Sequence, residues 1–144
     1  MESALYDCRR ILVIRLDEGE DLIEGIGSAA EKHGVDGGVI VSLTGAVVDP
    51  KIINPGGMGD EPEPVETQLE GKMEVDGGGN IALDDDERTV VHVHASFGPS
   101  PNKSYTGHLV SAKVKYFVEA VIAVLDRPMV RRVNLFGTKV LVLE

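Results

Sequence analysis

The chain has 144 residues, of which 42% are hydrophobic but only 4% aromatic, and its formal net charge is −10. Length and composition predict one domain over residues 1–144 with an aliphatic core and exclude a wholly disordered chain, while the charge disfavours non-specific binding to DNA and anionic membranes. The lone Cys8 excludes an intrachain disulfide and a cysteine-based zinc finger, and no apolar run suits a membrane span or a secretory signal, so we expect a cytoplasmic protein.

The first predicted elements are a strand and a helix. Residues 9–16 indicate a buried strand bounded by charge. Residues 19–33 are predicted to form a helix, because Asp17 and Glu20 resemble a capping box and Gly34 supplies a stop. The apolar residues of this helix fall on one face at positions i, i+4, i+7 and i+8: Leu22, Ile26, Ala29 and Ala30.

The middle of the chain is rich in β-branched residues and glycine. Residues 37–53 predict one long strand, or two strands bent at Gly45, and residues 54–64 are a loop by composition. Residues 65–75 and 80–85 are predicted as two strands, with the intervening glycine run as a hairpin turn. This run is not a nucleotide loop, because no Gly-Lys-Ser/Thr and no helix follow it.

The last third of the chain is expected to be mostly strands. Residues 88–97 form the clearest predicted strand, and residues 98–107 are a loop by composition. Residues 108–114 and 115–125 are expected as strands, with a short helix as the alternative for the second, and the segment FGTKVLVL closes the chain as another strand. About seven strands and one or two helices with short connections predict a compact α/β domain of the α+β type with a mostly antiparallel sheet.

Three of the four histidines fall close together. His92 and His94 are two residues apart on a predicted strand, so their side chains share a face, with α-carbons about 6.6–6.8 Å apart. His108 begins the next strand, and a hairpin would bring it beside them. Three neutral imidazoles can bind zinc and leave one tetrahedral position open. Copper, nickel and iron also suit imidazole, and the alternative is a set of hydrogen-bonded histidines in a polar cleft. His33, in the last turn of the predicted helix, is interpreted as structural.

The segment from His92 to Val110 resembles the signature of the PPC domain (plants and prokaryotes conserved domain) family. That signature is His-x-His, a polar loop and Gly-Gly-His-Leu, and the last element reads Thr106-Gly107-His108-Leu109 here. Residues 15–22, 42–46 and 70–81 resemble the family's opening strand and helix, its Ser-x-x-Gly-Ala strand and its central hairpin. The resemblance therefore covers nearly the whole chain.

The resemblance implies a compact α/β domain that assembles as a homotrimer, with His92, His94 and His108 as candidate metal ligands. Plant members carry a basic AT-hook that enters the DNA minor groove, and prokaryotic members are named as DNA-binding proteins by that analogy. This chain has no AT-hook, and the plant segment Gly-Arg-Phe-Glu-Ile-Leu reads Gly71-Lys72-Met73-Glu74-Val75-Asp76 here, without the Arg and Phe anchors. The family also resembles acetolactate decarboxylase, a zinc enzyme, in fold alone.

Two functions follow as hypotheses. The first is a regulatory module that binds a small-molecule ligand or a protein partner at or near a metal site. The second is a zinc-dependent hydrolase or lyase that uses the open coordination position and a carboxylate, for which Glu74 and Glu119 are the candidates. The loop residues Lys103, Ser104 and Tyr105 could line the mouth of the site, although an ordinary loop role is favoured. Ser96 and Ser100 lack the partners of a serine triad.

Direct DNA binding is the third hypothesis. Its local support is a basic patch in which Arg127, Arg131 and Arg132 lie near Lys139 in the sequence. A homotrimer would carry a formal charge of 3 × −10 = −30, which repels a phosphate backbone. We therefore expect no binding to random duplex DNA at physiological salt.

Overall fold

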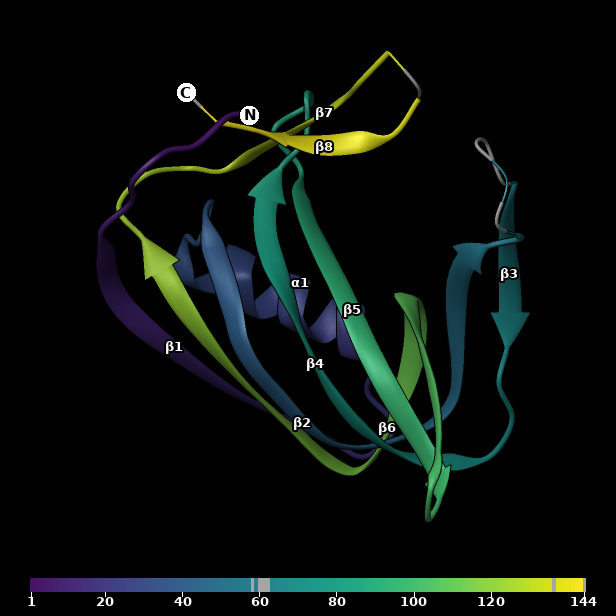
Figure 1. Ribbon diagram of the computed structural model, residues 1–144. Helices are drawn as coiled ribbons and strands as arrows, with labels where there is room; N and C mark the ends of the chain where they lie inside the picture. The colour runs from purple at the N-terminus through teal and green to yellow at the C-terminus, as the bar shows by residue number, and fades with distance from the viewer. Residues whose placement is uncertain (58, 60–62, 136, 144) are drawn as a thin grey trace.

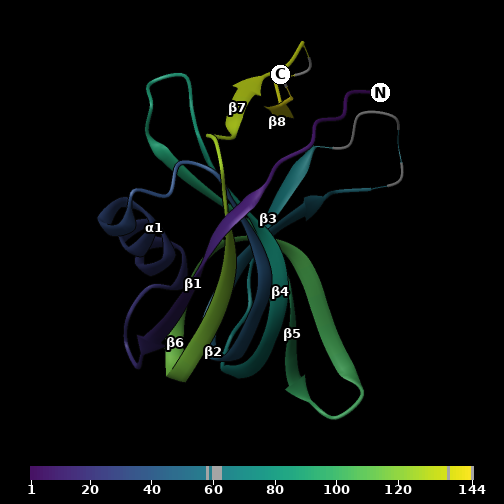
Figure 2. The same cartoon turned by 90° about the vertical axis from the view of Figure 1, so that its left-hand side faces the viewer.

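The computed structural model shows one helix packed against a strongly bent sheet (Figures 1 and 2). The structure describes residues 1–57, 59, 63–135 and 137–143. Within these residues no helix is long and apolar enough to span a membrane. The elements described are, in chain order, β1 (Cys8–Asp17), α1 (Leu22–His33), β2 (Gly38–Pro55), β3 (Pro64–Gln68), β4 (Lys72–Leu83), β5 (Thr89–Ser100), β6 (Lys103–Leu125), β7 (Val130–Val133) and β8 (Lys139–Val142). The predicted α/β class with a mostly antiparallel sheet is confirmed.

Helix α1 begins later than the predicted residue 19 because a different carboxylate caps it. Asp21 accepts hydrogen bonds from two backbone N–H groups of the first turn, at 3.0 and 3.2 Å. Glu20 instead accepts from the backbone N–H of Asp17 at 2.6 Å, so this pair orders the preceding turn. Gly34 ends the helix as predicted, in the left-handed conformation with φ 63° and ψ 48°.

The sheet has an inner face that is packed by α1 and an outer face that is not. Leu22, Ile26 and Ala30 of α1 are fully buried on the inner face. Because side chains alternate along a strand, buried Val93 and Ala95 of β5 point inwards, and the histidines beside them point outwards. The core that anchors the site strands is aliphatic apart from one aromatic ring, and its largest members are Phe97, Leu22, Ile26, Leu43, Ile81 and Ile122.

Four of the strands, β2, β4, β5 and β6, form a closed ring of pairings. Strand β2 pairs with β4, β4 with β5, β5 with β6, and β6 again with β2, all antiparallel. Strand β1 pairs with β6, and β3 pairs with β2. The short strands β7 and β8 pair with each other and lie across one end of β4 and β5, where Leu83 is paired with Val130 (Figure 1). This end of the outer face is therefore partly covered.

The predicted hairpin at residues 76–80 is wrong, because β4 runs without a turn through the glycine run. The physical reason is close packing against β5. A Cβ atom on Gly79 would overlap the carbonyl oxygen of His92, and one on Gly77 would lie 2.7 Å from the carbonyl oxygen of His94. The glycines therefore permit the close approach of β4 to β5 and do not form a turn.

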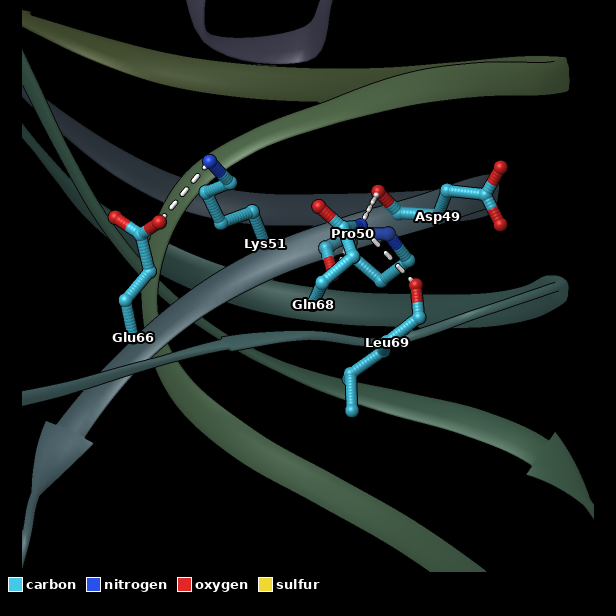
Figure 3. A network of polar contacts seen from close by, with 6 residues as sticks. All are labelled: Asp49, Pro50, Lys51, Glu66, Gln68 and Leu69. Atoms are coloured by element: carbon cyan, nitrogen blue, oxygen red, sulfur yellow. Dashed lines mark hydrogen bonds and ion pairs between the residues drawn. The ribbon is translucent and has the colours of Figure 1, made fainter.

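The prediction of a single strand over residues 65–75 is also wrong. This segment instead forms the end of β3 and the beginning of β4, with a break after Gln68. Gln68 ends β3, and its side-chain amide donates to the carbonyl oxygens of Asp49, Pro50 and Leu69 at 2.7, 3.3 and 3.2 Å (Figure 3). An ion pair of 3.0 Å between Lys51 and Glu66 joins β3 to β2 beside this amide. The amide thus fixes the point where β2 changes partner from β4 to β3.

The predicted loop over residues 98–107 is much shorter than expected. Strand β5 continues to Ser100 and β6 starts at Lys103, so the connection is a tight turn. The segment 115–125 is part of β6 and forms no helix, because it pairs with β1 on one side and β2 on the other. Two predicted segments lie partly outside the described residues, namely the loop at 54–64 (positions 58 and 60–62) and the last strand at 136–143 (position 136).

The remaining differences concern two strands. Strand β2 is the continuous alternative predicted for residues 37–53, bent at Gly45, whose φ is 148°. Strand β7 was not expected, because Val130–Val133 alternates too briefly to predict a strand.

Substitution of Gly79 tests the close approach of β4 to β5. We expect Gly79→Ala to lower the free energy of unfolding by about 2 kcal/mol or more, because the added methyl group meets backbone that cannot rotate away. Gly98→Ala on β5 is the control, since its Cβ would make only ordinary contacts at 3.8 and 3.9 Å. Urea denaturation measures both variants, and equal stabilities would contradict the packing role.

Candidate metal centre

His92, His94 and His108 form a compact cluster on the outer face of the sheet. The register places His94 of β5 directly opposite His108 of β6, and His92 lies two residues earlier on the same face of β5. One ring nitrogen from each histidine can be chosen so that all three lie within 4.8 Å of one another. The ring centroids are 5.1 Å apart for His92 and His94, 4.9 Å for His92 and His108, and 5.4 Å for His94 and His108.

The donor set fits a divalent transition metal. Two nitrogen ligands of one tetrahedral zinc ion lie about 3.4 Å apart, as follows from a Zn–N distance of about 2.0–2.1 Å. Small side-chain rotations therefore bring the three nitrogens from their present separation onto one ion. An all-imidazole set suits zinc, copper or nickel better than calcium or magnesium, which prefer oxygen ligands.

The surroundings of His92 and His108 favour their neutral imidazole forms. The pKa of His92 is lowered to about 4, mainly because the ring is partly buried, and further by the charge of Arg131 and the other two histidines. Burial is also the largest reason that the pKa of His108 is lowered, followed by His94 and Arg131. Because a metal binds the unprotonated nitrogen, these two rings are ready to act as ligands at neutral pH.

A buried arginine lies beside the cluster. Arg131 is only 7% exposed, and burial lowers its pKa. Its Nε donates to Oδ1 of Asn80 at 3.2 Å, and its Nη1 donates to the carbonyl oxygen of Lys139 at 2.9 Å. The sequence placed Arg131 in a basic surface patch and missed its position at the histidine cluster, because nothing in the sequence shows that β7 crosses the end of β4.

The histidines and Arg131 line one pocket of about 430 Å³. Strand β5 supplies an apolar wall, and β7 and β8 with the turn between them supply a polar edge. No described lining residue is acidic; the full set is Val90, Val91, His92, His94, His108, Arg131, Thr138 and Lys139.

Neither predicted carboxylate reaches the histidine cluster. Glu74 is exposed and lies opposite Gly98, four residues along β4 from the position opposite His94, or about 13 Å. Glu119 is exposed on β6 between Arg15 of β1 and Thr44 of β2. At the level of Glu119 the neighbours of β6 are β1 and β2, and β5 is reached only across β2 and β4. Counted along the sheet, Glu119 is therefore three strand spacings, about 14 Å, from β5.

The other residues singled out from the sequence lie outside the pocket. Lys103 and Ser104 are exposed, and the Lys103 ammonium group lies 5.1 Å from the centre of the Tyr105 ring. Ser96 exchanges a 3.0 Å hydrogen bond with Thr106 across β5 and β6.

The predicted basic patch is divided between separate contacts. Arg127 stacks on the ring of Tyr6 at 4.4 Å, and Arg132 forms an ion pair of 3.3 Å with Asp85. Arg131 instead faces the histidine pocket.

Comparison with known proteins agrees with this architecture. The family model of the Plants and Prokaryotes Conserved (PCC) domain, which is also abbreviated PPC, matches residues 6–126. The chain belongs to this family. The clustered His92, His94 and His108 lie within the matched residues, whereas Arg131 lies beyond them. No curated protein matches the sequence.

Solved structures from archaea and bacteria share the fold over nearly the whole chain. A PPC protein from Pyrococcus horikoshii is 26% identical with a TM-score of 0.85, over 98% of this chain and 96% of that one. A metal-containing protein from Archaeoglobus fulgidus is 26% identical with a TM-score of 0.87, over 99% of both chains. A candidate DNA-binding protein from Bacteroides thetaiotaomicron, 18% identical with a TM-score of 0.78 over 97% of this chain and 99% of that one, shares the fold.

The lowered histidine pKa values predict how the stability of metal-free protein depends on pH. Because the pKa of His92 is about 4 in the folded chain and 6.5 in the unfolded chain, the unfolded chain binds the proton first as pH falls. The contribution of neutral His92 to the free energy of unfolding is fully present above pH 6.5 and is lost as the pH falls from 6.5 to about 4. In chelator-treated wild-type protein the urea midpoint should therefore fall over this pH range. The urea midpoint of His92→Gln should fall less steeply, because the variant lacks this imidazole. His33→Gln is the control variant and should show the wild-type pH dependence. An equal pH dependence of the urea midpoint in wild type and His92→Gln would contradict the role given to His92.

Proposed function

We propose that this PCC-domain protein is a small metal-binding module of the cytoplasm, with zinc at His92, His94 and His108, that works as a homotrimer and binds a small ligand or a protein partner. The observation that carries the proposal is the convergence of three imidazoles on one point of the outer face. The similarity to the metal-containing Archaeoglobus fulgidus protein over 99% of the chain supports it. The free, exposed Cys8 agrees with a reducing compartment.

The three histidines would hold the ion from one side only. Zinc supplies Lewis acidity and one further coordination position when it is bound by three protein ligands. His92, His94 and His108 would hold the ion at the wall of the pocket, in which Val90 and Val91 form an apolar surface. An external ligand is therefore the natural occupant, since no described carboxylate lines the pocket.

The metal content of the purified protein tests the proposal. Protein supplied with zinc should hold about one ion per chain, measured by elemental analysis after gel filtration. The His92→Gln, His94→Gln double variant should lose the ion, because two of its three donors are gone. His33→Gln is the matched control, as His33 lies on α1 away from the cluster, and it should keep the ion. Full metal content in the double variant would refute the site.

The homotrimer is supported by an outer apolar patch on β1, β2 and β6. Three of its members are strongly exposed, with Ile11 at 58%, Val13 at 67% and Val41 at 58%. The register connects the patch to the metal centre, because Val39 is opposite Asn80 and Asn80 is opposite His92. A contiguous exposed apolar surface indicates an interface. The outer apolar patch consists of Ile11, Val13, Val39, Val41, Val121 and Ala123.

Sedimentation velocity tests the assembly. The wild-type protein should sediment as a particle of three times the chain mass of 15.4 kDa. Val13→Lys should shift the population towards monomer, because it places a charge in the outer apolar patch. Val65→Lys on β3, at 49% exposure and outside the patch, should leave the trimer intact. A monomeric wild-type protein would refute the proposal.

The two other hypotheses receive less support from the geometry. A zinc hydrolase or lyase needs an acid or base within hydrogen-bond reach of the substrate, and Glu74 and Glu119 lie too far from the histidines to serve. DNA binding would need a continuous basic surface, but Arg127 and Arg132 are held in separate local contacts. A binding module is therefore the function that the site supports best.

A further inference from the structure

Arg131 carries a buried charge that no acidic side chain neutralises among the described residues. Its side chain is 7% exposed, and its two hydrogen bonds go to neutral acceptors, the side-chain oxygen of Asn80 and the backbone carbonyl of Lys139. No ion pair of the described residues includes it. A buried cation held by neutral groups alone is unfavourable, so a counter-ion from outside the chain would stabilise it strongly.

The neighbouring cations differ from Arg131 in this respect. Arg132, the next residue, lies 3.3 Å from a carboxylate oxygen of Asp85. Lys139 lies 4.0 Å from a carboxylate oxygen of Asp84, and its side chain is 53% exposed. Both neighbours therefore have acidic partners on the chain. Arg131 is the described cation of this strand pair that is both buried and directed at the pocket.

The pocket has the size and lining for an organic anion. Its volume of about 430 Å³ falls in the range of small-molecule sites and exceeds the needs of a simple inorganic ion. Val90 and Val91 offer an apolar wall. Arg131 supplies hydrogen-bond donors and a positive charge, and the three histidines would supply the proposed metal ion. The positive end of a ligand would find no acidic partner among the described lining residues.

We propose that Arg131 and the metal at the three histidines together bind the carboxylate group of a small organic acid, whose short carbon chain lies against Val90 and Val91. The planar guanidinium group matches a carboxylate with parallel hydrogen bonds, and the open metal position accepts a carboxylate oxygen. This inference rests on the proposed metal site. It assigns the chemical class of the ligand and gives Arg131 the role of recognising it.

The test compares butyrate with butyramide, which has the same chain length but no charge. Isothermal titration calorimetry of the zinc-loaded protein should show butyrate binding at least about tenfold more tightly than butyramide, because one charge-assisted pair is worth about that factor. Arg131→Met should weaken butyrate binding by about tenfold or more while zinc content stays the same. Arg132→Met is the matched control and should change butyrate affinity by less than about twofold, because its partner is Asp85.

Several results would overturn the proposal. They are the absence of butyrate binding to zinc-loaded protein, equal affinities in wild type and Arg131→Met, or inorganic phosphate binding more tightly than butyrate. If Arg131→Met does not fold, Arg131→Lys replaces it, since it keeps the charge but loses the paired donors and should still weaken binding. Equal affinities in wild type and Arg131→Lys would then refute recognition by the guanidinium group.

Repeating the butyrate titration on metal-free protein distinguishes a failure of the proposed metal site from a failure of the proposed anion site. If the protein binds no zinc but binds butyrate in a manner that depends on Arg131, the proposed function fails and the anion site remains. If zinc binds and butyrate does not, the metal site remains and the anion site is refuted. If neither binds, both are refuted.

Discussion

The pairing of β5 between β4 and β6 is the constraint on which the site depends. Its register sets His94 opposite His108 and leaves His92 on the same face. The glycine run of β4 allows that strand to approach the backbone beneath both histidines of β5. On the inner face the alternate residues Val93 and Ala95 are buried in the core. The positions of the imidazoles are thus determined by the backbone pairing of β5 with its neighbours and by core packing.

Electrostatics separates this pocket from the rest of the molecule. The chain as a whole is strongly acidic, with a formal charge of −10. The pocket instead combines three imidazoles with a buried guanidinium group and no described acidic lining residue. Under the proposed anion site, this local reversal of sign would favour small anions over the long phosphate backbone of a nucleic acid.

The sequence predicted the features that depend on local pattern. The His-x-His spacing on a strand, the strand alternation and the Gly34 helix stop follow from backbone periodicity and conformation, and the structure confirms them. The glycines at residues 77–79 predict a turn that the structure does not contain, because composition cannot separate a glycine required by a turn from one required by a neighbouring backbone. The position of Arg131 was missed because it depends on a contact between β4 and β7, whose paired residues Leu83 and Val130 are far apart in the chain.

The family match ends at residue 126, and β7 begins at Val130. The histidines therefore lie within the segment that the family model matches, while Arg131 lies on the short C-terminal strand pair that crosses the end of β4. This strand pair meets the rest of the fold through the pairing of Leu83 with Val130 and the hydrogen bond from Arg131 to Asn80. The ion pairs of Arg132 with Asp85 and of Lys139 with Asp84 add to the contact. Substitutions in this strand pair would change the charge beside the pocket and leave the three imidazoles in place. The charge at the pocket and the set of imidazoles can thus be altered independently, because different segments of the chain supply them.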